Sequence, residues 1–307
     1  MSGNNRNLML IANPVSGKKA VASSLSDVCR TFLNRGWIPS VFITGGRGDA
    51  TGFVRKYGKD YGRIVAMGGD GTMNETVTGI IEAGLDTDFA FIPSGTTNDF
   101  ATTHRIPSDI AEATKLAATG KVRKLDACRF NERYFMFHCG CGFFASVVNE
   151  TYQEMKNTLG YLAYILDGVA NAMSLSPKHA RFVIDGREFE GAFIYLGILS
   201  TLSLGGSITT LPSDMVRTDD VRFEFFFARA PKDIIELGEE LSEFTGKNFN
   251  GEHINLYNMK KCVVDSDSDL DWSLDGEPYS GNKKHAEIEV LEKRISFVSS
   301  DDDETLS

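Results

Sequence analysis

Three glycine-bearing segments of the sequence combine backbone freedom with polar side chains. They are residues 13–19 (NPVSGKK), 68–75 (GGDGTMNE) and 93–101 (PSGTTNDFA). Glycine lets backbone N–H groups approach a phosphate closely, and a helix that starts behind it adds partial positive charge. Each segment taken alone is more often a tight turn beside a helix than a binding site. Together they favour a phosphate site.

A fourth segment, residues 274–278 (LDGEP), carries two carboxylates around a glycine. Asp-Gly is a good hairpin turn, so the segment alone is ordinarily structural. Together with the three glycine-bearing segments, this remote carboxylate segment fits a phosphate site better than four unrelated turns would. The sequence has no Walker A pattern and lacks the protein-kinase signature set. If a nucleotide binds, a different loop system must hold it.

The elements that must position these segments are predicted strands followed by helices. Apolar runs at residues 7–12, 38–44, 63–67 and 89–93 alternate with helical patterns, and each of the first three polar segments follows such a run. This alternation predicts a parallel sheet covered on both faces, whose loops gather at one edge. We expect Asp49 to cap the helix that follows the second strand.

After about Leu125 the pattern changes to mostly antiparallel strands, with a hairpin turn at Asp185 and Gly186 and a long helical stretch at residues 144–173. The predicted fold class is α/β plus β. We expect residues 1–124 to form a Rossmann-like domain with a parallel sheet and helices on both faces. We expect residues 125–298 to form a mostly antiparallel β-sandwich domain. A return of the last segment to the first domain is left open, and residues 299–307 are an acidic tail expected to be disordered.

Composition narrows the partners and the compartment. A net charge of -10 and a pI near 5.1 argue against a nucleic-acid partner. Five scattered cysteines indicate buried thiols in a reducing cytosol rather than a zinc site or disulfide framework. No apolar run approaches the roughly 20 residues of a membrane span, and no signal peptide is evident. The predicted location is cytoplasmic. If a lipid is involved, the protein would meet it from the water side, by peripheral membrane association.

The sequence resembles the soluble bacterial diacylglycerol kinase-like lipid kinases, which share a catalytic-domain type with sphingosine and ceramide kinases. The family motifs stand here as Asn-Pro-Val-Ser-Gly (residues 13–17), Gly-Gly-Asp-Gly-Thr-Met-Asn-Glu (68–75), Gly-Thr-Thr-Asn-Asp-Phe-Ala (95–101) and Asp-Gly-Glu (275–277). The similarity spans nearly the whole chain. NAD kinases and phosphofructokinases carry related Gly-Gly-Asp-Gly-Thr loops, but Asn74-Glu75 and the later Thr-Asn-Asp-Phe favour the lipid-kinase branch. The resemblance implies the two-domain architecture that diacylglycerol kinases share with NAD kinases. Residues 1–124 would be the nucleotide-binding catalytic domain, and residues 125–298 would be the β-sandwich domain for the lipid substrate.

The resemblance implies an ATP- and Mg²⁺-dependent kinase for a lipid hydroxyl, above all diacylglycerol giving phosphatidic acid, with its active site in an interdomain cleft. Glu277 is the implied general base, and Asp70 and Asp99 are implied in a network that orients magnesium and its waters. The residues implied to bind ATP are Asn13, Pro14, Val15, Ser16, Gly17, Lys18, Thr44, Gly68, Gly69, Asp70, Gly71, Thr72, Met73, Asn74 and Thr96.

The sequence departs from the family at a second implied metal site. Relatives carry a loop close to Leu-Ala-Pro-Asp-Ala-Ser-x-Asn-Asp-Gly, and residues 211–223 read LPSDMVRTDDVRF. The resemblance implies a structural Mg²⁺ held by the carboxylate of Asp219 and the main chain of Val216 and Val221. Asp220 replaces the family glycine, which leaves metal binding at this loop open. Thr102 also stands where relatives often have an arginine.

Two alternatives stay open from the sequence. One is an NAD kinase-like enzyme, which would leave the Asn-Asp-Phe and Asp-Gly-Glu segments unexplained. The other is a non-catalytic nucleotide- or lipid-binding regulator, supported by the altered magnesium loop. The sequence does not name the lipid, the surface that meets the membrane, or the oligomeric state, for which a homodimer is one option.

Overall fold

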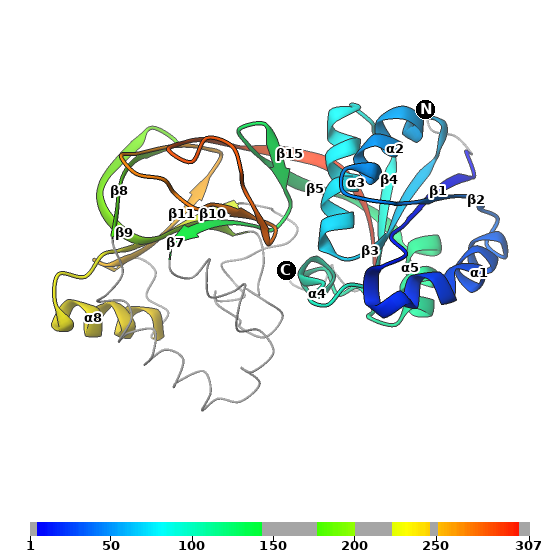
Figure 1. Cartoon of the computed structure of the whole chain (residues 1–307), viewed down its shortest axis with the longest axis horizontal. Coiled ribbons are helices and arrows are strands. Elements are labelled where there is room, and N and C mark those ends of the chain that lie inside the picture. Colours follow the sequence, from blue (N-terminus) through cyan, green and yellow to red (C-terminus); the bar gives the residue numbers. More distant parts are fainter. Residues whose placement is uncertain (1–4, 143–176, 200–222, 246–250, 301–307) are drawn as a thin grey trace. The chain divides into compact units, whose positions relative to one another are not determined.

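The computed structural model describes residues 5–142, 177–199, 223–245 and 251–300 (Figure 1). The chain folds into two compact units. Unit 1 holds the residues up to Ala127 and those from Leu291 onward, and unit 2 runs from Cys128 to Val290. Two long strands, β5 (Lys121–Phe130) and β15 (His285–Ser299), each contribute to both units.

Unit 1 is built on a parallel sheet, as the alternating pattern predicts. Its strands are β1 (Asn7–Ala12), β2 (Ile38–Ile43), β3 (Arg63–Gly68) and β4 (Asp88–Pro93). They lie in the order β4-β3-β1-β2, and every neighbouring pair among them is parallel. Every residue of β3 is buried, because helices cover both faces of the sheet.

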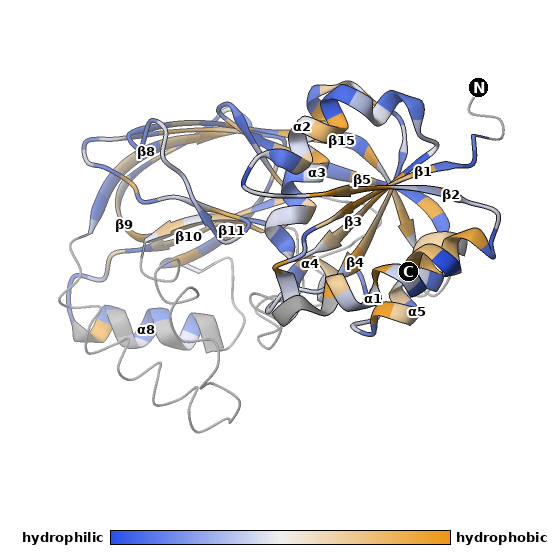
Figure 2. Cartoon of the chain, turned by 45° about the vertical axis from the view of Figure 1, so that its right-hand side comes forward, coloured by the Kyte–Doolittle hydropathy of each residue, from blue (hydrophilic) through white to orange (hydrophobic). Residues whose placement is uncertain are grey.

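The helices of unit 1 follow the strands that the sequence predicts. They are α1 (Ala20–Leu33), α2 (Asp49–Tyr57), α3 (Asp70–Glu82), α4 (Asp99–Thr103) and α5 (Ile110–Thr119), with 3-10 turns at Ser16–Lys19 and Gly58–Asp60. α2 packs against α3 on one face of the sheet, and α1 packs against α5 on the other. In Figure 2, β3 and β4 carry the orange of apolar residues between these two layers.

The predicted cap of α2 is wrong. Gly48 is the N-cap, with φ 85°, and no side chain of its own caps the helix. Asp49 is the first helical residue, and its Oδ2 turns back to accept the N–H groups of Gly45 and Gly46 at 2.7 and 2.9 Å. A carboxylate one residue inside the helix can reach the preceding loop, so Asp49 shapes that loop instead of capping the helix.

Unit 2 is antiparallel throughout its described strands. These are β6 (Arg133–Phe135), β7 (His138–Gly142), β8 (Lys178–Ile184), β9 (Arg187–Leu199), β10 (Phe223–Arg229), β11 (Ile254–Met259), β12 (Lys261–Ser266), β13 (Ser273–Leu274) and β14 (Glu277–Pro278), with one helix, α8 (Ile234–Thr245). The predicted hairpin turn is confirmed: Asp185 and Gly186 have φ 46° and 85°, the left-handed pair of a type I′ turn.

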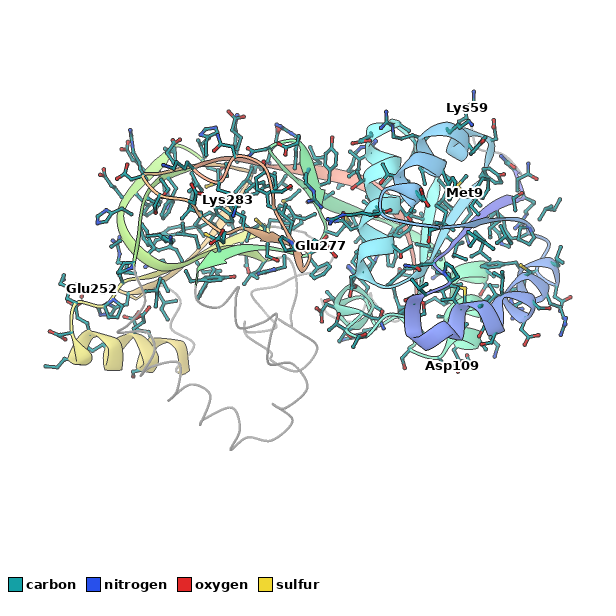
Figure 3. The ribbon with its side chains drawn as sticks, in the orientation of Figure 1. Met9, Lys59, Asp109, Glu252, Glu277 and Lys283 are labelled. Atoms are coloured by element: carbon teal, nitrogen blue, oxygen red, sulfur yellow. The ribbon has the colours of Figure 1, made fainter. Side chains whose placement is uncertain are left out.

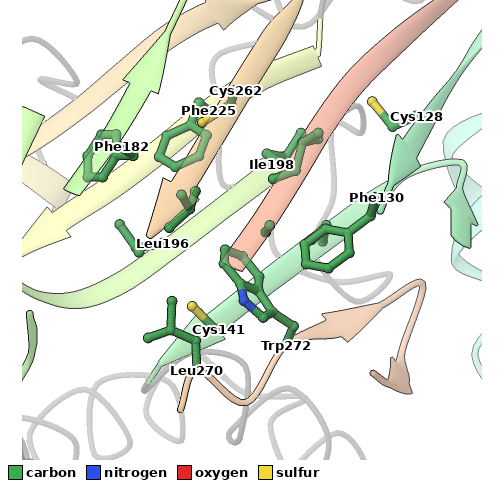
Figure 4. Packing of buried hydrophobic residues seen from close by; sticks show 14 of the residues in the cluster. Cys128, Phe130, Cys141, Phe182, Leu196, Ile198, Phe225, Cys262, Leu270 and Trp272 are labelled. Atoms are coloured by element: carbon green, nitrogen blue, oxygen red, sulfur yellow. The ribbon is translucent and has the colours of Figure 1, made fainter. Parts of the chain in front are cut away.

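Aromatic side chains fill the core of unit 2. Phe182, Phe225 and Trp272 belong to one buried cluster, together with the thiols of Cys141 and Cys262 (Figure 4). Along β10, odd-numbered phenylalanines enter this cluster, while Phe226 packs with Tyr195 and Leu199 in a separate buried cluster. Since side chains alternate along a strand, β10 buries both of its faces. This aromatic strand is therefore part of the core of unit 2.

Several predictions fall outside the described residues. The helical stretch at 144–173 and the implied magnesium ligands Asp219, Val216 and Val221 are among them, and so is most of the acidic tail. These stay predictions. Within the ranges that the structure describes, no helix combines the length and the apolar character needed to cross a membrane.

Candidate functional site

The loops that follow β1, β3 and β4 meet at the carboxyl edge of the parallel sheet in unit 1. Strand register brings Ala12 beside Met67, and Gly68 beside Pro93. The backbone pairing continues past the strand ends, because the Asn13 N–H donates to the Met67 carbonyl at 2.9 Å and the Ser94 N–H to the Gly68 carbonyl at 2.7 Å. The three motifs therefore lie side by side, as the sequence predicts.

Side chains also join the motifs. Asn13 Nδ2 donates to Thr72 Oγ1 at 3.1 Å, which links the first loop to the second. Ser16 Oγ donates to the Ser94 carbonyl at 3.0 Å, which links the first loop to the third. These partners are 59 and 78 residues apart in the chain. Asn13 and Thr72, which are both predicted to contact the nucleotide, are thus hydrogen-bonded to each other.

Two glycines allow the second and third loops to touch. A Cβ placed on Gly95 would lie 2.6 Å from Gly69 Cα and 2.8 Å from Asn98 Oδ1. Both distances are far shorter than a carbon contact allows. The motif pattern predicts that the glycines serve close approach of a phosphate. The structure shows that Gly95, at least, is required by the approach of one loop to the other.

Asp70 holds the third loop against α3. Its Oδ2 accepts from Thr97 Oγ1 and from the Asp99 N–H, both at 3.2 Å, and its Oδ1 accepts from the Phe100 N–H at 3.3 Å. Burial raises the pKa of this carboxyl above its usual range, and the hydrogen bonds from the loop oppose that shift. In the structure, Asp70 anchors the start of α4. Its part in a network that orients magnesium stays a prediction.

Phe100 shows why the third motif contains an aromatic residue. Its side chain is fully buried, 4.3 Å from the ring of His104 and 5.3 Å from that of Phe297, measured between centroids. Burial lowers the pKa of His104 to about 3, so the imidazole is neutral near pH 7. This packing fixes α4, and with it the polar residues at the start of that helix.

The remaining predicted nucleotide residues differ in exposure. Met73 is fully buried and belongs to the core, whereas Val15 is 80% exposed and Thr96 is exposed. The Thr44 N–H donates to the Ala12 carbonyl at 3.0 Å, so the loop after β2 begins beside the first motif. The side chain of Lys18 is outside the described set. Every motif predicted from the first 101 residues therefore starts at the same sheet edge.

The Asp-Gly-Glu segment belongs to unit 2 and forms the turn between β13 and β14. Asp275 and Gly276 have φ 47° and 81°, again a type I′ pair. The Asp275 side chain is buried and accepts three backbone N–H groups, from Met136 at 2.8 Å and from Phe137 and His138 at 3.0 Å each. Its own N–H donates to the His138 carbonyl at 2.7 Å. Sequence reasoning missed this role.

Glu277 is placed differently from its neighbour. It opens β14 and is only partly buried, on the short hairpin labelled in Figure 3. The three backbone amides that bond to Asp275 fix the turn of this hairpin. The Asp275 carboxylate therefore has a structural role, whereas Glu277 is the more exposed carboxylate of the motif.

Comparison with known proteins identifies the family. The model of the "Diacylglycerol kinase catalytic domain" matches residues 7–130. The chain is 30% identical over 274 residues to a diacylglycerol kinase of Bacillus subtilis (strain 168), covering 89% of each protein. It is also 30% identical over 299 residues to a diacylglycerol kinase of Staphylococcus aureus (strain Newman), covering 95% of this chain and 92% of that protein. The chain belongs to the diacylglycerol kinase family.

Solved structures agree on the fold. A diacylglycerol kinase structure from Bacillus anthracis str. Sterne superposes with a TM-score of 0.74 at 20% identity, covering 97% of this chain and 98% of that one. A second structure from the same organism gives a TM-score of 0.77 at 22% identity. The predicted family and fold class are confirmed. As a member of this family the chain is a lipid kinase, and kinase membership implies ATP use.

Proposed function

We propose that this diacylglycerol kinase family member transfers the γ-phosphoryl group of ATP to the free hydroxyl of diacylglycerol, giving phosphatidic acid. One observation carries the proposal: the three motif loops of unit 1 hydrogen-bond to one another at the carboxyl edge of the parallel sheet. In open α/β sheets this edge is where ligands bind. Diacylglycerol is proposed as the substrate because of the relatives' names, and nucleotide binding is proposed because of the arrangement of the motif loops.

The nucleotide would lie along the loop edge of unit 1. The predicted contacts are the segment 13–18, Thr44, the segment 68–74 and Thr96. Support comes from the start of α3 immediately after Gly69, where no N-cap side chain bonds to the helix and the first-turn N–H groups lack partners within the helix, as at any helix start. The proposed contacts place phosphates beside Ser16 and Thr72, whose hydroxyls already join neighbouring loops.

Magnesium would accompany the nucleotide. The chemistry of the site fits, because Asp70 and Asp99 supply carboxylate oxygens beside the phosphate loops, and Mg²⁺ prefers oxygen ligands. Among the described residues, no group of three or more histidine, cysteine and acidic side chains could hold a metal by itself. This suits an ion bound largely by phosphates and water, which would neutralise phosphate charge. A structural Mg²⁺ on Asp219, Val216 and Val221 remains part of the proposal.

Glu277 would accept the proton of the attacking hydroxyl. A general base must be presented to solvent or substrate, and its backbone must be fixed, because transfer is sensitive to small displacements. Glu277 is partly exposed and follows the anchored turn at Asp275, whereas the Asp275 carboxylate is occupied by three amides. Placement of the reaction in an interdomain cleft, peripheral contact with a membrane, and a homodimer stay predictions.

The test uses the full chain, radiolabelled ATP, Mg²⁺ and a panel of acceptors presented in detergent micelles. Diacylglycerol, sphingosine and ceramide are compared with soluble NAD. We expect label to enter the diacylglycerol fraction as phosphatidic acid. Transfer to NAD alone would replace the proposal with an NAD kinase. Binding of ATP with no transfer to any acceptor would indicate a regulator.

A further inference from the structure

We infer that Glu75, the last residue of the second motif, is a positioning residue for the nucleotide. Its carboxylate docks the loop after β2 onto α3: Oε1 accepts the Gly48 N–H at 2.8 Å, and Oε2 accepts the Ala50 N–H at 3.3 Å. Thr51 Oγ1 donates to the Glu75 carbonyl at 2.7 Å. The inference rests on the proposed binding of ATP by unit 1.

The start of α2 explains why an outside carboxylate is needed. The first N–H groups of any helix have no partner within the helix, and a side chain at the N-cap usually accepts one of them. The N-cap here is Gly48, which has no side chain. Asp49 is occupied by the amides of Gly45 and Gly46. Glu75, from a different helix, supplies the missing acceptors and places negative charge at the positive end of α2.

This arrangement fixes a fourth loop at the candidate site. The loop of residues 44–48 is held at its beginning by the bond from Thr44 to Ala12, and at its end by Glu75. Thr44 is a predicted nucleotide contact that has no motif of its own. Two residues of the second motif therefore bond to two different loops. Thr72 bonds to the first loop, and Glu75 bonds to the loop after β2.

The chain provides a matched control in Glu82. It lies at the other end of α3 and also links α3 to α2, through Arg55 at 3.5 Å. Glu75→Gln and Glu82→Gln remove the same charge from the same helix. A glutamine at position 75 has one carbonyl oxygen for two N–H donors, and its NH₂ would face the other donor. A glutamine at position 82 meets no such conflict.

The experiment measures ATP affinity by calorimetry, and kcat and KM for ATP and for diacylglycerol, in the full chain. For Glu75→Gln we expect the Kd and KM for ATP to rise by roughly ten-fold, with kcat at saturating ATP within about two-fold and KM for the lipid unchanged. Glu82→Gln should match the wild type in all four. Thr51→Val, a milder change, should raise KM for ATP by about three-fold.

The outcomes separate the inference from the proposed function. If the wild type binds ATP and phosphorylates the lipid, but folded Glu75→Gln keeps wild-type affinity for ATP, the inference is overturned and the function stands. Equal losses in Glu75→Gln and Glu82→Gln would assign the effect to packing of α2 on α3 and would also overturn it. If the wild type binds no ATP, the proposed function fails and takes the inference with it. Should Glu75→Gln not fold, Thr51→Val decides by the same criterion.

Discussion

Polar side chains at the loop edge of unit 1 differ from two buried acids of unit 2 in their hydrogen bonding. At the loop edge of unit 1, buried or half-buried polar side chains face one another, as Asn13 faces Thr72 and Asp70 faces the start of α4. In unit 2, Glu224 and Glu240 are 4% and 5% exposed. Glu224 Oε2 and both Glu240 oxygens have no hydrogen-bond partner in the described part of the chain, and burial raises the pKa of each to about 8.

This difference in hydrogen bonding distinguishes a candidate binding site from a hydrophobic core. Buried polar atoms normally have partners. At the loop edge of unit 1, the partners of Asn13, Ser16 and Asp70 come from other motifs, so each of these residues helps to place another loop. In unit 2 burial raises the pKa of these two acids, which favours the protonated, neutral form near pH 7. Asp275 differs from both, because three amides satisfy it. Like the polar side chains at the loop edge of unit 1, Asp275 bonds to a segment that is distant in the sequence.

The largest expected effect separates chemistry from binding. Glu277→Gln removes the proposed base and should lower kcat by roughly 10²–10⁴-fold. Since Glu277 belongs to unit 2, KM for ATP should change little. Steady-state kinetics with varied ATP measure both quantities. Glu190→Gln, on β9 of the same unit, is the control and should be fully active. A Glu277→Gln enzyme with wild-type kcat would remove the base from the account.

The next effect breaks the contact between loops in unit 1. Gly95→Ala forces a Cβ against Gly69 and Asn98, so the second and third loops must separate. We expect kcat/KM for ATP to fall by about 10²-fold. Gly52→Ala, where an added Cβ meets nothing within 4 Å, should keep full activity. Equal kinetics for the two alanine variants would show that the loop contact is dispensable.

A smaller effect tests the anchored turn of unit 2. Asp275→Asn leaves one acceptor oxygen for three amides and should cost about 1–3 kcal/mol of unfolding free energy. Because the turn carries Glu277, kcat should also fall by about ten-fold. Asp185 accepts two backbone N–H groups at an exposed Asp-Gly turn, so Asp185→Asn should cost less and leave kcat unchanged. Urea unfolding and kinetics on both variants make the comparison, which fails if the two behave alike.

The last prediction concerns stability alone, and no change in kcat is expected from it. Glu224 binds its proton more tightly when folded, so its contribution is complete below the unfolded pKa near 4.5 and is lost as pH rises through about 8. Between these values the wild type should lose roughly 1.4 kcal/mol per pH unit from this group. Glu224→Gln should remove that slope and melt above the wild type at pH 8.5. Parallel pH profiles of the two proteins would show that Glu224 is already ionised.

The sequence predicts the elements of unit 1 well because each rests on local pattern. Apolar runs specify strands, glycines and polar residues mark the loops, and parallel pairing alone brings the loops together. It predicts the Asp-Gly turns for the same reason. From the sequence, Asp49 looks like the cap of α2, and Glu75 is visible only as part of a motif. The bond that shows Glu75 to be the acceptor at the start of α2 joins residues 27 apart, so local pattern cannot reveal it.

Longer-range bonds were harder still to predict. The amides that Asp275 accepts lie 137 to 139 residues away, and nothing in the local pattern of either segment points to the other. The burial of Glu224 and Glu240 was equally hard to predict from the sequence. Glu224 stands among phenylalanines in an alternating strand, where a solvent-facing acid is the usual expectation. Only the second buried cluster, with Tyr195 and Phe226, shows that this face is covered too.

The central claim is that unit 1 binds the nucleotide while Glu277 of unit 2 acts on the acceptor. The most direct test is the Kd of ATP, measured by titration calorimetry for the wild type, Asp70→Asn and Glu277→Gln. We predict that Asp70→Asn weakens ATP binding by at least about ten-fold, because the third loop loses its anchor, and that Glu277→Gln stays within about two-fold of the wild type. The reverse order, or equal affinities for all three proteins, would contradict the account.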